Sequence, residues 1–198
     1  MLSAASCNKW WIEDILKTAD YDGAVEGAVP GDNRVWFLPY LMGERSPHND
    51  VNASGVFFGI RPDTTREEMS LAVLEGVSFA LRDCVEIARN SGIEINRANL
   101  CGGGAKSKVW RKILANVLDC VITMTESEQG PSLGAAMLAM VGAGEYASVE
   151  EAAEKTVKTE EVARPDAETV KKYNEKYKIF KALYPALKEA YKQAAGII

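Results

Sequence analysis

Apolar residues recur at helical spacing in two long stretches of the first half of the chain. Residues 3–18 carry tryptophan, isoleucine and leucine at this spacing and predict a helix. A longer helix is predicted over residues 66–90, where Thr65 and Glu68 have the sequence of a capping box at its start. Apolar residues spread well beyond one face of this second helix, so we expect it to be central and covered on more than one side.

Short apolar runs alternate with helical patterns further along the chain. Residues 97–101 and 121–125 predict strands, and a helical stretch follows each of them. Ser107 is placed to cap the first of these helices and Pro131 to open the second. The order strand, helix, strand, helix predicts an α/β fold with a parallel layer. A further short strand is predicted over residues 35–38.

The last quarter of the chain has a different pattern. The charged stretch over residues 145–168 is interpreted as a solvated connector without chemistry. Aromatic residues and leucine then recur at spacings of four and three, which predicts a helix with Pro185 as a kink or restart point. We therefore divide the single predicted domain, residues 1–198, into a core over about 1–144 and a connector with a helical tail over about 145–198.

Composition and charge exclude several classes of protein. Hydrophobic residues make up 47% of the chain, enough for a buried core, and the net charge of −5 argues against nucleic acid or an anionic membrane as a partner. No apolar stretch is long enough for a membrane span, and the first residues do not have the pattern of a secretory signal. The cysteines lack metal-site spacing and are expected to be reduced thiols packed as small hydrophobes, which favours a cytoplasmic protein without a metal site. They are Cys7, Cys84, Cys101 and Cys120.

Three consecutive glycines, Gly102, Gly103 and Gly104, stand between a predicted strand and a predicted helix. They do not form a Walker A loop, because Leu100 stands where the first glycine belongs. They do not form a dinucleotide fingerprint either, because Ser107 occupies the position of its last glycine. A strand end, residues without side-chain bulk and a helix start suit a ligand that contacts backbone, but they also suit a tight turn. The spacing alone leaves both interpretations open.

Other candidate residues carry weaker signals. His48 lies in a proline-containing loop without a paired nucleophile, which favours a structural role over that of a general base. Glu44 and Arg45 are interpreted as an internal ion pair that fixes the same loop, rather than as substrate ligands. Ser46 has no neighbouring histidine and aspartate arranged as in a hydrolase. No catalytic residue is predicted within the chain.

Several stretches resemble the FGGY carbohydrate kinases, and together they cover nearly the whole chain. FLPYLMGERSPHNDVNASGVFFGI resembles the corresponding part of that family, and GVFFGIRPDTTREEMSLAVLEG is similar to its second signature. CGGGAKS resembles the family's adenosine motif, GPSLGAAMLA resembles the helix after it, and the tail resembles the usual ending. The sequence GERSPH is more similar to the xylulokinases of this family than to its gluconate and glycerol kinases.

The resemblance implies an actin-like ATPase fold of two RNase-H-like lobes, in which this chain is the C-terminal lobe without its opening strands. The family's catalytic aspartate and its phosphate-binding hairpin are then expected before Met1. The glycines are expected to seat the adenosine of ATP and not to cradle the transferred phosphate. The residues that the resemblance places at or near this seat are Gly102, Gly103, Gly104, Ala105, Ser107 and Lys108.

The implied activity is transfer of the γ-phosphate of ATP to a sugar hydroxyl, with D-xylulose converted to D-xylulose 5-phosphate as the favoured reaction. The implied cofactors are ATP and Mg²⁺, with the Mg²⁺ ligands mainly outside this chain. The implied partners are a small sugar and the N-terminal lobe of the same enzyme, and a homodimer is left open. The chain by itself is expected to be inactive. Two alternatives also stay open, a non-catalytic actin-like nucleotide-binding lobe and a split-gene fragment that mediates subunit contact.

Overall fold

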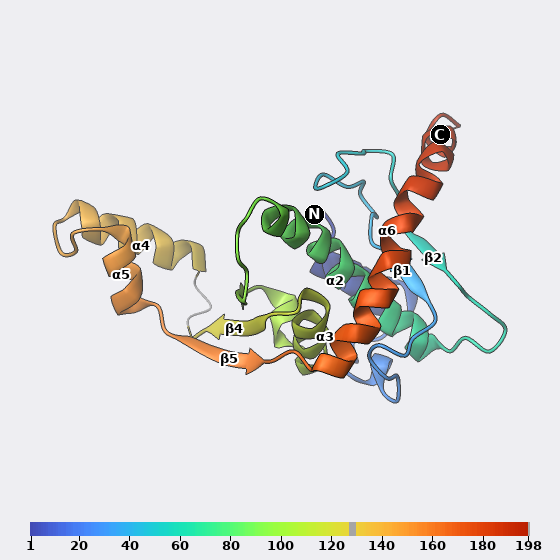
Figure 1. Ribbon diagram of the computed structural model, residues 1–198, viewed down its shortest axis with the longest axis horizontal. Coiled ribbons are helices and arrows are strands. Elements are labelled where there is room, and N and C mark those ends of the chain that lie inside the picture. The colour runs from blue at the N-terminus through green and yellow to red at the C-terminus, as the bar shows by residue number, and fades with distance from the viewer. Residues whose placement is uncertain (127–129, 198) are drawn as a thin grey trace.

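The computed structural model describes residues 1–126 and 130–197. Figure 1 shows a body built around a long helix, with a smaller pair of helices standing to one side. The elements in chain order are α1 (Ala5–Lys9), η1 (Trp10–Ile15), η2 (Gly23–Val25), β1 (Trp36–Leu38), β2 (Val56–Phe58), α2 (Arg66–Asn90), β3 (Arg97–Leu100), η3 (Gly103–Lys106), α3 (Lys108–Leu118), β4 (Val121–Thr125), α4 (Gly130–Gly142), α5 (Val149–Thr156), β5 (Thr159–Ala163) and α6 (Ala167–Ala195).

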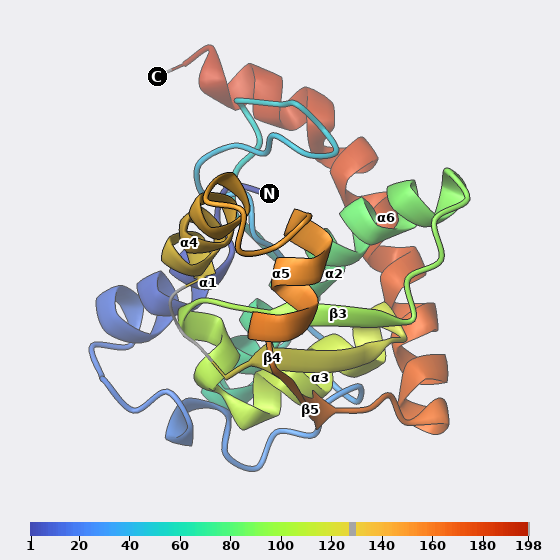
Figure 2. The same cartoon turned by 90° about the vertical axis from the view of Figure 1, so that its left-hand side faces the viewer.

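The strands form two small sheets. Strands β1 and β2 make an antiparallel pair in which Trp36 faces Phe58. Strands β3, β4 and β5 make the second sheet, and Figure 2 shows them side by side. Strands β3 and β4 are parallel, as the strand–helix–strand order predicts, because α3 crosses between them. Strand β5 adds an antiparallel edge to this sheet.

Helix α2 lies at the centre of the body. It begins with the predicted capping box, in which the Thr65 hydroxyl accepts from the Glu68 N–H and the Glu68 carboxylate accepts from the Thr65 N–H. All residues from Ser70 to Ala80 are buried, so the prediction of cover on more than one side is confirmed. Helices α3 and α6 and strand β1 all pack on this helix.

A buried ion pair joins α2 to α6. The carboxylate of Glu75 accepts from the Lys176 ammonium at 2.6 Å and from the Tyr173 hydroxyl at 2.9 Å. It also accepts from the Gly31 N–H at 3.1 Å, which ties the loop before β1 to the same group. The side chain of Glu75 is fully buried and that of Lys176 is 9% exposed. With several hydrogen bonds to one carboxylate, the charge can lie within the core.

The predicted connector over residues 145–168 is not a bare linker, because it contains helix α5 and strand β5. The charged residues of β5 obscured this strand in the sequence. Glu160 and Glu161 are exposed, whereas the last two residues of the strand are half-buried. A kink or a restart is predicted at Pro185, and the restart does not occur, since α6 continues through this proline. Of the cysteines, Cys101 is exposed and does not pack as a small hydrophobe.

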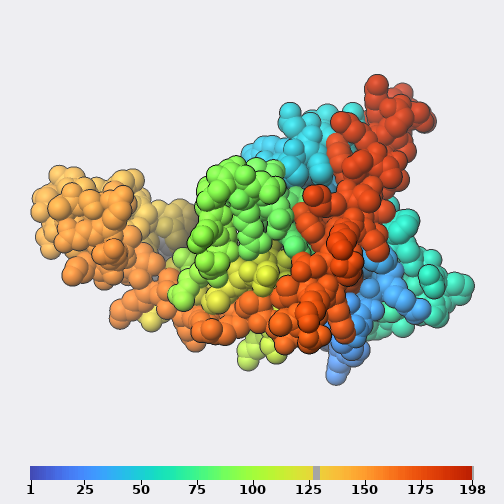
Figure 3. Space-filling model, viewed as in Figure 1, coloured from blue at the N-terminus to red at the C-terminus, as the bar shows by residue number. Residues whose placement is uncertain are grey.

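Helices α4 and α5 pack on each other away from the body, and the space-filling view in Figure 3 shows them as a protrusion. Helix α5 begins at the cap residue Ser148, whose hydroxyl accepts from the Glu151 N–H at 3.2 Å. Helix α4 has no buried residue. Among the described residues, no helix is both long enough and apolar enough to span a membrane.

Candidate functional site

The glycine stretch forms a short turn between β3 and α3. Gly102 has a φ of +86°, which favours glycine, and a Cβ at this position would meet no atom within 4 Å. The turn then continues as η3, and the Ser107 hydroxyl accepts from the Trp110 N–H at 3.3 Å. The prediction that Ser107 is the N-cap of α3 is therefore confirmed.

Gly103 and Gly104 are glycines for different reasons. A Cβ on Gly103 would point into open space, whereas a Cβ on Gly104 would lie 2.7 Å from Cζ3 of Trp110. The Trp110 indole is fixed in this position, because its Nε1 donates to the Leu74 carbonyl at 3.2 Å and to the Ser78 hydroxyl at 3.1 Å. Gly104 is thus required by the close approach of a buried indole.

A hollow of about 580 Å³ lies in front of this turn. Of the six residues assigned by resemblance, Gly103, Gly104 and Ser107 line it. Ala105 is instead buried behind the turn, where its carbonyl accepts from the Arg111 guanidinium. The complete lining is Ala5, Ser6, Asn8, Lys9, Tyr21, Asp22, Gly103, Gly104, Lys106, Ser107 and Trp110, and it includes neither Gly102 nor Lys108.

The opposite wall was missed by the sequence interpretation. It comes from α1, with Ser6, Asn8 and Lys9, and from the loop after η1, with Tyr21. The Tyr21 hydroxyl donates to the Glu13 carboxylate at 2.8 Å, and burial together with this bond raises the pKa of Tyr21. The polar residues between the apolar ones in residues 3–18 are equally typical of a solvent-exposed helix face, so the sequence held no signal specific to this wall.

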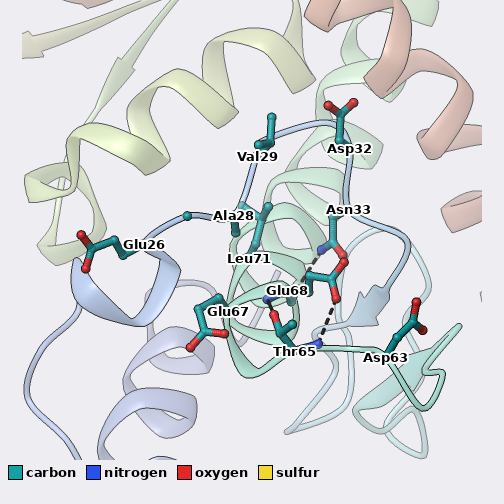
Figure 4. Close-up of a pocket in the computed structure, with 11 residues that line it drawn as sticks. Glu26, Ala28, Val29, Asp32, Asn33, Asp63, Thr65, Glu67, Glu68 and Leu71 are labelled. Carbon is teal, nitrogen blue, oxygen red and sulfur yellow. Dashed lines mark hydrogen bonds between the residues drawn. The ribbon is translucent and has the colours of Figure 1, made fainter.

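A second hollow of about 480 Å³ lies at the start of α2, and Figure 4 shows acidic side chains around it beside apolar and uncharged polar ones. Its carboxylates are partly committed to the fold: the Glu68 side chain caps Thr65, and the Arg34 guanidinium holds the pKa of Asp63 below its usual range. Among the described residues, no group of three or more His, Cys, Asp or Glu side chains is arranged to hold a metal ion. The acidic residues that line it are Glu26, Asp32, Asp63, Glu67 and Glu68.

The difference in charge separates the two hollows. The hollow at the glycine turn has two lysines, Lys9 and Lys106, against one acid, Asp22, whereas the second hollow has several acids and no base. The acidic second hollow disfavours a ligand that carries phosphates, whereas the hollow at the glycine turn has no excess of acids and can accept the nucleoside end of such a ligand. The glycine turn is therefore the better candidate site for a nucleotide.

Two residues of the loop that contains GERSPH, Glu44 and His48, pack within the fold. Glu44 is buried and accepts from the Ser46 N–H at 3.2 Å, whereas Arg45 is exposed. Both residues are described, and they form no ion pair with each other, so the predicted Glu44–Arg45 pair is wrong. The His48 ring stacks on Tyr184 with centroids 3.6 Å apart, and burial lowers the pKa of His48. Its packing agrees with the predicted structural role.

Comparison with known proteins identifies the family. The sequence model described as FGGY family of carbohydrate kinases, C-terminal domain, matches residues 3–143. The chain belongs to this family. Its fold is that of the C-terminal lobe of an actin-like ATPase, as the resemblance implied.

The relatives include several xylulose kinases. The chain is 38% identical over 159 residues to a xylulose kinase of Staphylococcus epidermidis, which covers 80% of this chain and 32% of that protein. It is 38% identical over 190 residues to a xylulose kinase of Escherichia coli strain K12, which covers 94% and 39%. The chain thus spans about a third of the length of these relatives.

Solved structures agree with this assignment. The ligand-bound xylulose kinase from Lactobacillus acidophilus superimposes with a TM-score of 0.90 at 26% identity, covering 96% of this chain and 39% of that one. A structure titled xyloylose kinase from Brucella ovis gives a TM-score of 0.86 at 33% identity with the same coverage. Both the fold and the sequence therefore match this chain to the C-terminal domain of the family.

Proposed function

We propose that this chain is the nucleotide-binding lobe of a carbohydrate kinase that transfers the γ-phosphate of ATP to a sugar hydroxyl. The observation that carries the proposal is the hollow of about 580 Å³ between the glycine turn and α1. One of its walls is bare backbone at Gly103 and Gly104, and this wall leads into the start of α3. Backbone without side chains lets a flat ligand approach closely, and a helix start offers N–H groups to it.

The adenosine of ATP is proposed to lie against Gly103, Gly104 and Ser107, with Asn8 and Tyr21 facing it from the opposite wall. Gly102 contributes the backbone turn, and Ala105 supports it from behind. Lys108 starts α3 outside the lining, so its proposed role is at the edge of the site. In the whole enzyme, Mg²⁺ and its ligands are assigned to the phosphate end of ATP, away from this hollow.

D-Xylulose is the proposed sugar. The support comes from GERSPH, which resembles the xylulokinases, and from relatives that are themselves named xylulose kinases. In this proposal the 198 residues alone are inactive, because the family resemblance assigns the catalytic base to the N-terminal lobe. A coupled assay with ATP and D-xylulose checks this point, and turnover by the purified 198-residue chain contradicts it.

Filling the hollow tests the nucleotide site directly. Gly103→Val adds bulk where a Cβ meets nothing within 4 Å and where φ is not positive, so the fold should tolerate it. We expect the affinity for ADP to fall roughly tenfold or more, measured by fluorescence with the methylanthraniloyl (mant) derivative of ADP. The control is Ala28→Val, which creates the same side chain in the acidic hollow by adding two methyl groups there. Equal affinity of wild type and Gly103→Val, with unchanged melting, argues that the glycines are only a turn.

Gly104→Val is the less informative variant, although Gly104 lies at the centre of the glycine turn. Its φ is not in the left-handed region, and its Cβ would collide with Trp110 and not with a ligand. Loss of binding in that variant therefore cannot be separated from displacement of the indole. The expectation that Gly104 lies at the adenosine stays a prediction, and Gly104→Val does not test it because the added Cβ meets Trp110.

A further inference from the structure

Two tryptophans donate to two serines of the central helix α2. The Trp11 Nε1 donates to the Ser70 hydroxyl at 2.8 Å, and the Trp110 Nε1 donates to the Ser78 hydroxyl at 3.1 Å. Both serines are fully buried. They lie roughly two helical turns apart, so the two indoles reach α2 at separate levels along its axis.

The serine hydroxyls are oriented to accept these bonds. Ser70 donates its own proton to the Arg66 carbonyl at 2.9 Å, and Ser78 donates to the Leu74 carbonyl at 2.8 Å. With the hydroxyl proton committed to the preceding turn of α2, the oxygen lone pairs face away from the helix. Each serine therefore acts as a fixed acceptor on an otherwise apolar surface.

Each tryptophan belongs to one wall of the hollow at the glycine turn. Trp11 lies in η1, which continues α1, and α1 supplies Ser6, Asn8 and Lys9 to the lining. Trp110 lies in α3, lines the hollow itself and contacts the position of Gly104. The two walls are thus attached to the same helix through the same kind of hydrogen bond.

We propose that the Trp11–Ser70 and Trp110–Ser78 bonds set the separation of the two walls and so preorganise the nucleotide site. This inference rests on the proposed function. The four residues are positioning residues, since the serines lie beneath the site and act through the indoles. A ligand held between two walls loses affinity when either wall shifts, because its contacts to both are no longer made together.

The experiment compares serine variants with a tryptophan variant elsewhere in the core. Ser70→Ala and Ser78→Ala each remove one acceptor while leaving both indoles and every lining residue unchanged. The control is Trp36→Phe in β1, which removes a similar indole bond, from Nε1 to the Lys176 carbonyl at 3.1 Å, away from the hollow. Binding of mant-ADP and thermal melting are measured for each protein. Ser78→Cys, with a weaker acceptor of similar size, replaces Ser78→Ala where the alanine variant does not fold.

We expect Ser70→Ala to bind mant-ADP roughly three- to tenfold more weakly than wild type, as for loss of one buried hydrogen bond. Ser78→Ala should give a smaller loss in the same direction, because the Trp110 Nε1 keeps its bond to the Leu74 carbonyl. Trp36→Phe should melt at a lower temperature but bind with wild-type affinity. The proposal is overturned when the serine variants lose stability yet keep wild-type affinity, because the bonds are then only structural. It is also overturned when Trp36→Phe weakens binding as much as they do. Absence of binding by wild type itself instead removes the proposed function, and this inference with it.

Discussion

Helix α4 is less polar than helix α2, yet it is the more exposed of the two. Helix α4 contains no charged residue, yet none of its residues is buried, and Leu138 is 63% exposed. Helix α2 contains many charged residues, yet every residue from Ser70 to Ala80 is buried, including Glu75. Apolar composition alone therefore does not tell which helix forms the core of this chain.

The difference comes from the partners that each helix meets. The polar groups of α2 are satisfied one by one, with Glu75 bonded to Lys176 and Tyr173, and with Ser78 bonded to Trp110. Its apolar groups pack against α3, α6 and β1. Helix α4 packs on α5 and otherwise presents its apolar side chains at the surface of a protrusion. A helix is buried here when several elements supply partners for it.

Glycine-to-alanine substitution at the middle of each helix should give the largest contrast. A Cβ on Gly76 in α2 would lie 2.1 Å from the Phe37 carbonyl oxygen, so Gly76→Ala must displace β1. We expect it to cost about 4–5 kcal/mol or more and to leave the chain largely unfolded in urea titrations. The matched change Gly134→Ala in α4 meets no atom within 4 Å and should leave the unfolding midpoint unchanged or slightly higher. Similar midpoints for the two variants contradict the contrast.

Removal of the charge partner of α2 should give the next largest effect. Lys176→Met leaves the Glu75 carboxylate buried without its cation, and we expect a loss of about 3–5 kcal/mol in the free energy of unfolding. The control is Lys178→Met, which breaks an exposed pair with Glu175 on the same helix and should cost less than about 1 kcal/mol. Chemical denaturation measures both variants. A small effect of Lys176→Met indicates that water reaches the carboxylate.

Local features of the fold were predictable from the sequence because local interactions determine them. The bounds of α2 and its capping box follow from Thr65 and Glu68 together with the apolar spacing, and β4 was predicted with its observed bounds. Strand β5 was missed, because its charged residues face solvent and only its pairing with β4 makes it a strand. Such pairing depends on a segment distant in the sequence, which periodicity does not contain.

The candidate site was predictable on one wall only. The turn at Gly102 and the cap at Ser107 are consequences of adjacent residues, and the sequence pointed to both. The opposite wall, with Asn8 and Tyr21, meets the glycines only after α1 and α3 have both packed on α2. The contact of Gly104 with Trp110 could not be predicted for the same reason, because the ring reaches this position through the tertiary placement of the indole.

The pH dependence of stability should reveal the buried carboxyl of α2. Burial raises the pKa of Asp83 well above its usual range, to about 6, although the Tyr177 hydroxyl donates to it at 2.6 Å. Because the pKa of Asp83 is higher in the folded chain than in the unfolded chain, its protonated form stabilises the fold. This contribution to the free energy of unfolding is complete below about pH 4 and is lost as the pH rises to about 6. In wild type, Asp83 should lower the free energy of unfolding by about 1–3 kcal/mol as the pH rises through this window, and Asp83→Asn should abolish this change. Urea titration at several pH values measures both proteins.

The difference between the variant and wild type isolates Asp83 from the rest of the chain. His48 acts in the opposite direction. Burial lowers the pKa of His48 in the folded chain, so its protonation as the pH falls lowers the free energy of unfolding. His48 Nε2 lies 4.0 Å from Asp83 Oδ2, so the two groups interact, and both proteins therefore carry His48→Gln, which removes the His48 titration from the difference. Helix α4 has no ionisable side chain and contributes no slope of its own. An unchanged slope in Asp83→Asn means that the carboxyl is hydrated in the folded chain.

The exposed apolar face of α4 should affect association, with little effect on stability. Leu138→Lys places a charge on this face, and we expect the free energy of unfolding to change by less than about 0.5 kcal/mol, because the side chain has few contacts to lose.

The 198-residue chain itself should self-associate as its concentration rises, and Leu138→Lys should reduce this self-association, because exposed apolar patches associate in water. Sedimentation velocity over a concentration series measures it. The control is Ile87→Lys, since Ile87 is 52% exposed on α2 and isolated exposed apolar residues are common on monomers. Equal association of wild type and Leu138→Lys shows that α4 does not contribute, and equal loss in both variants shows that added charge alone is responsible.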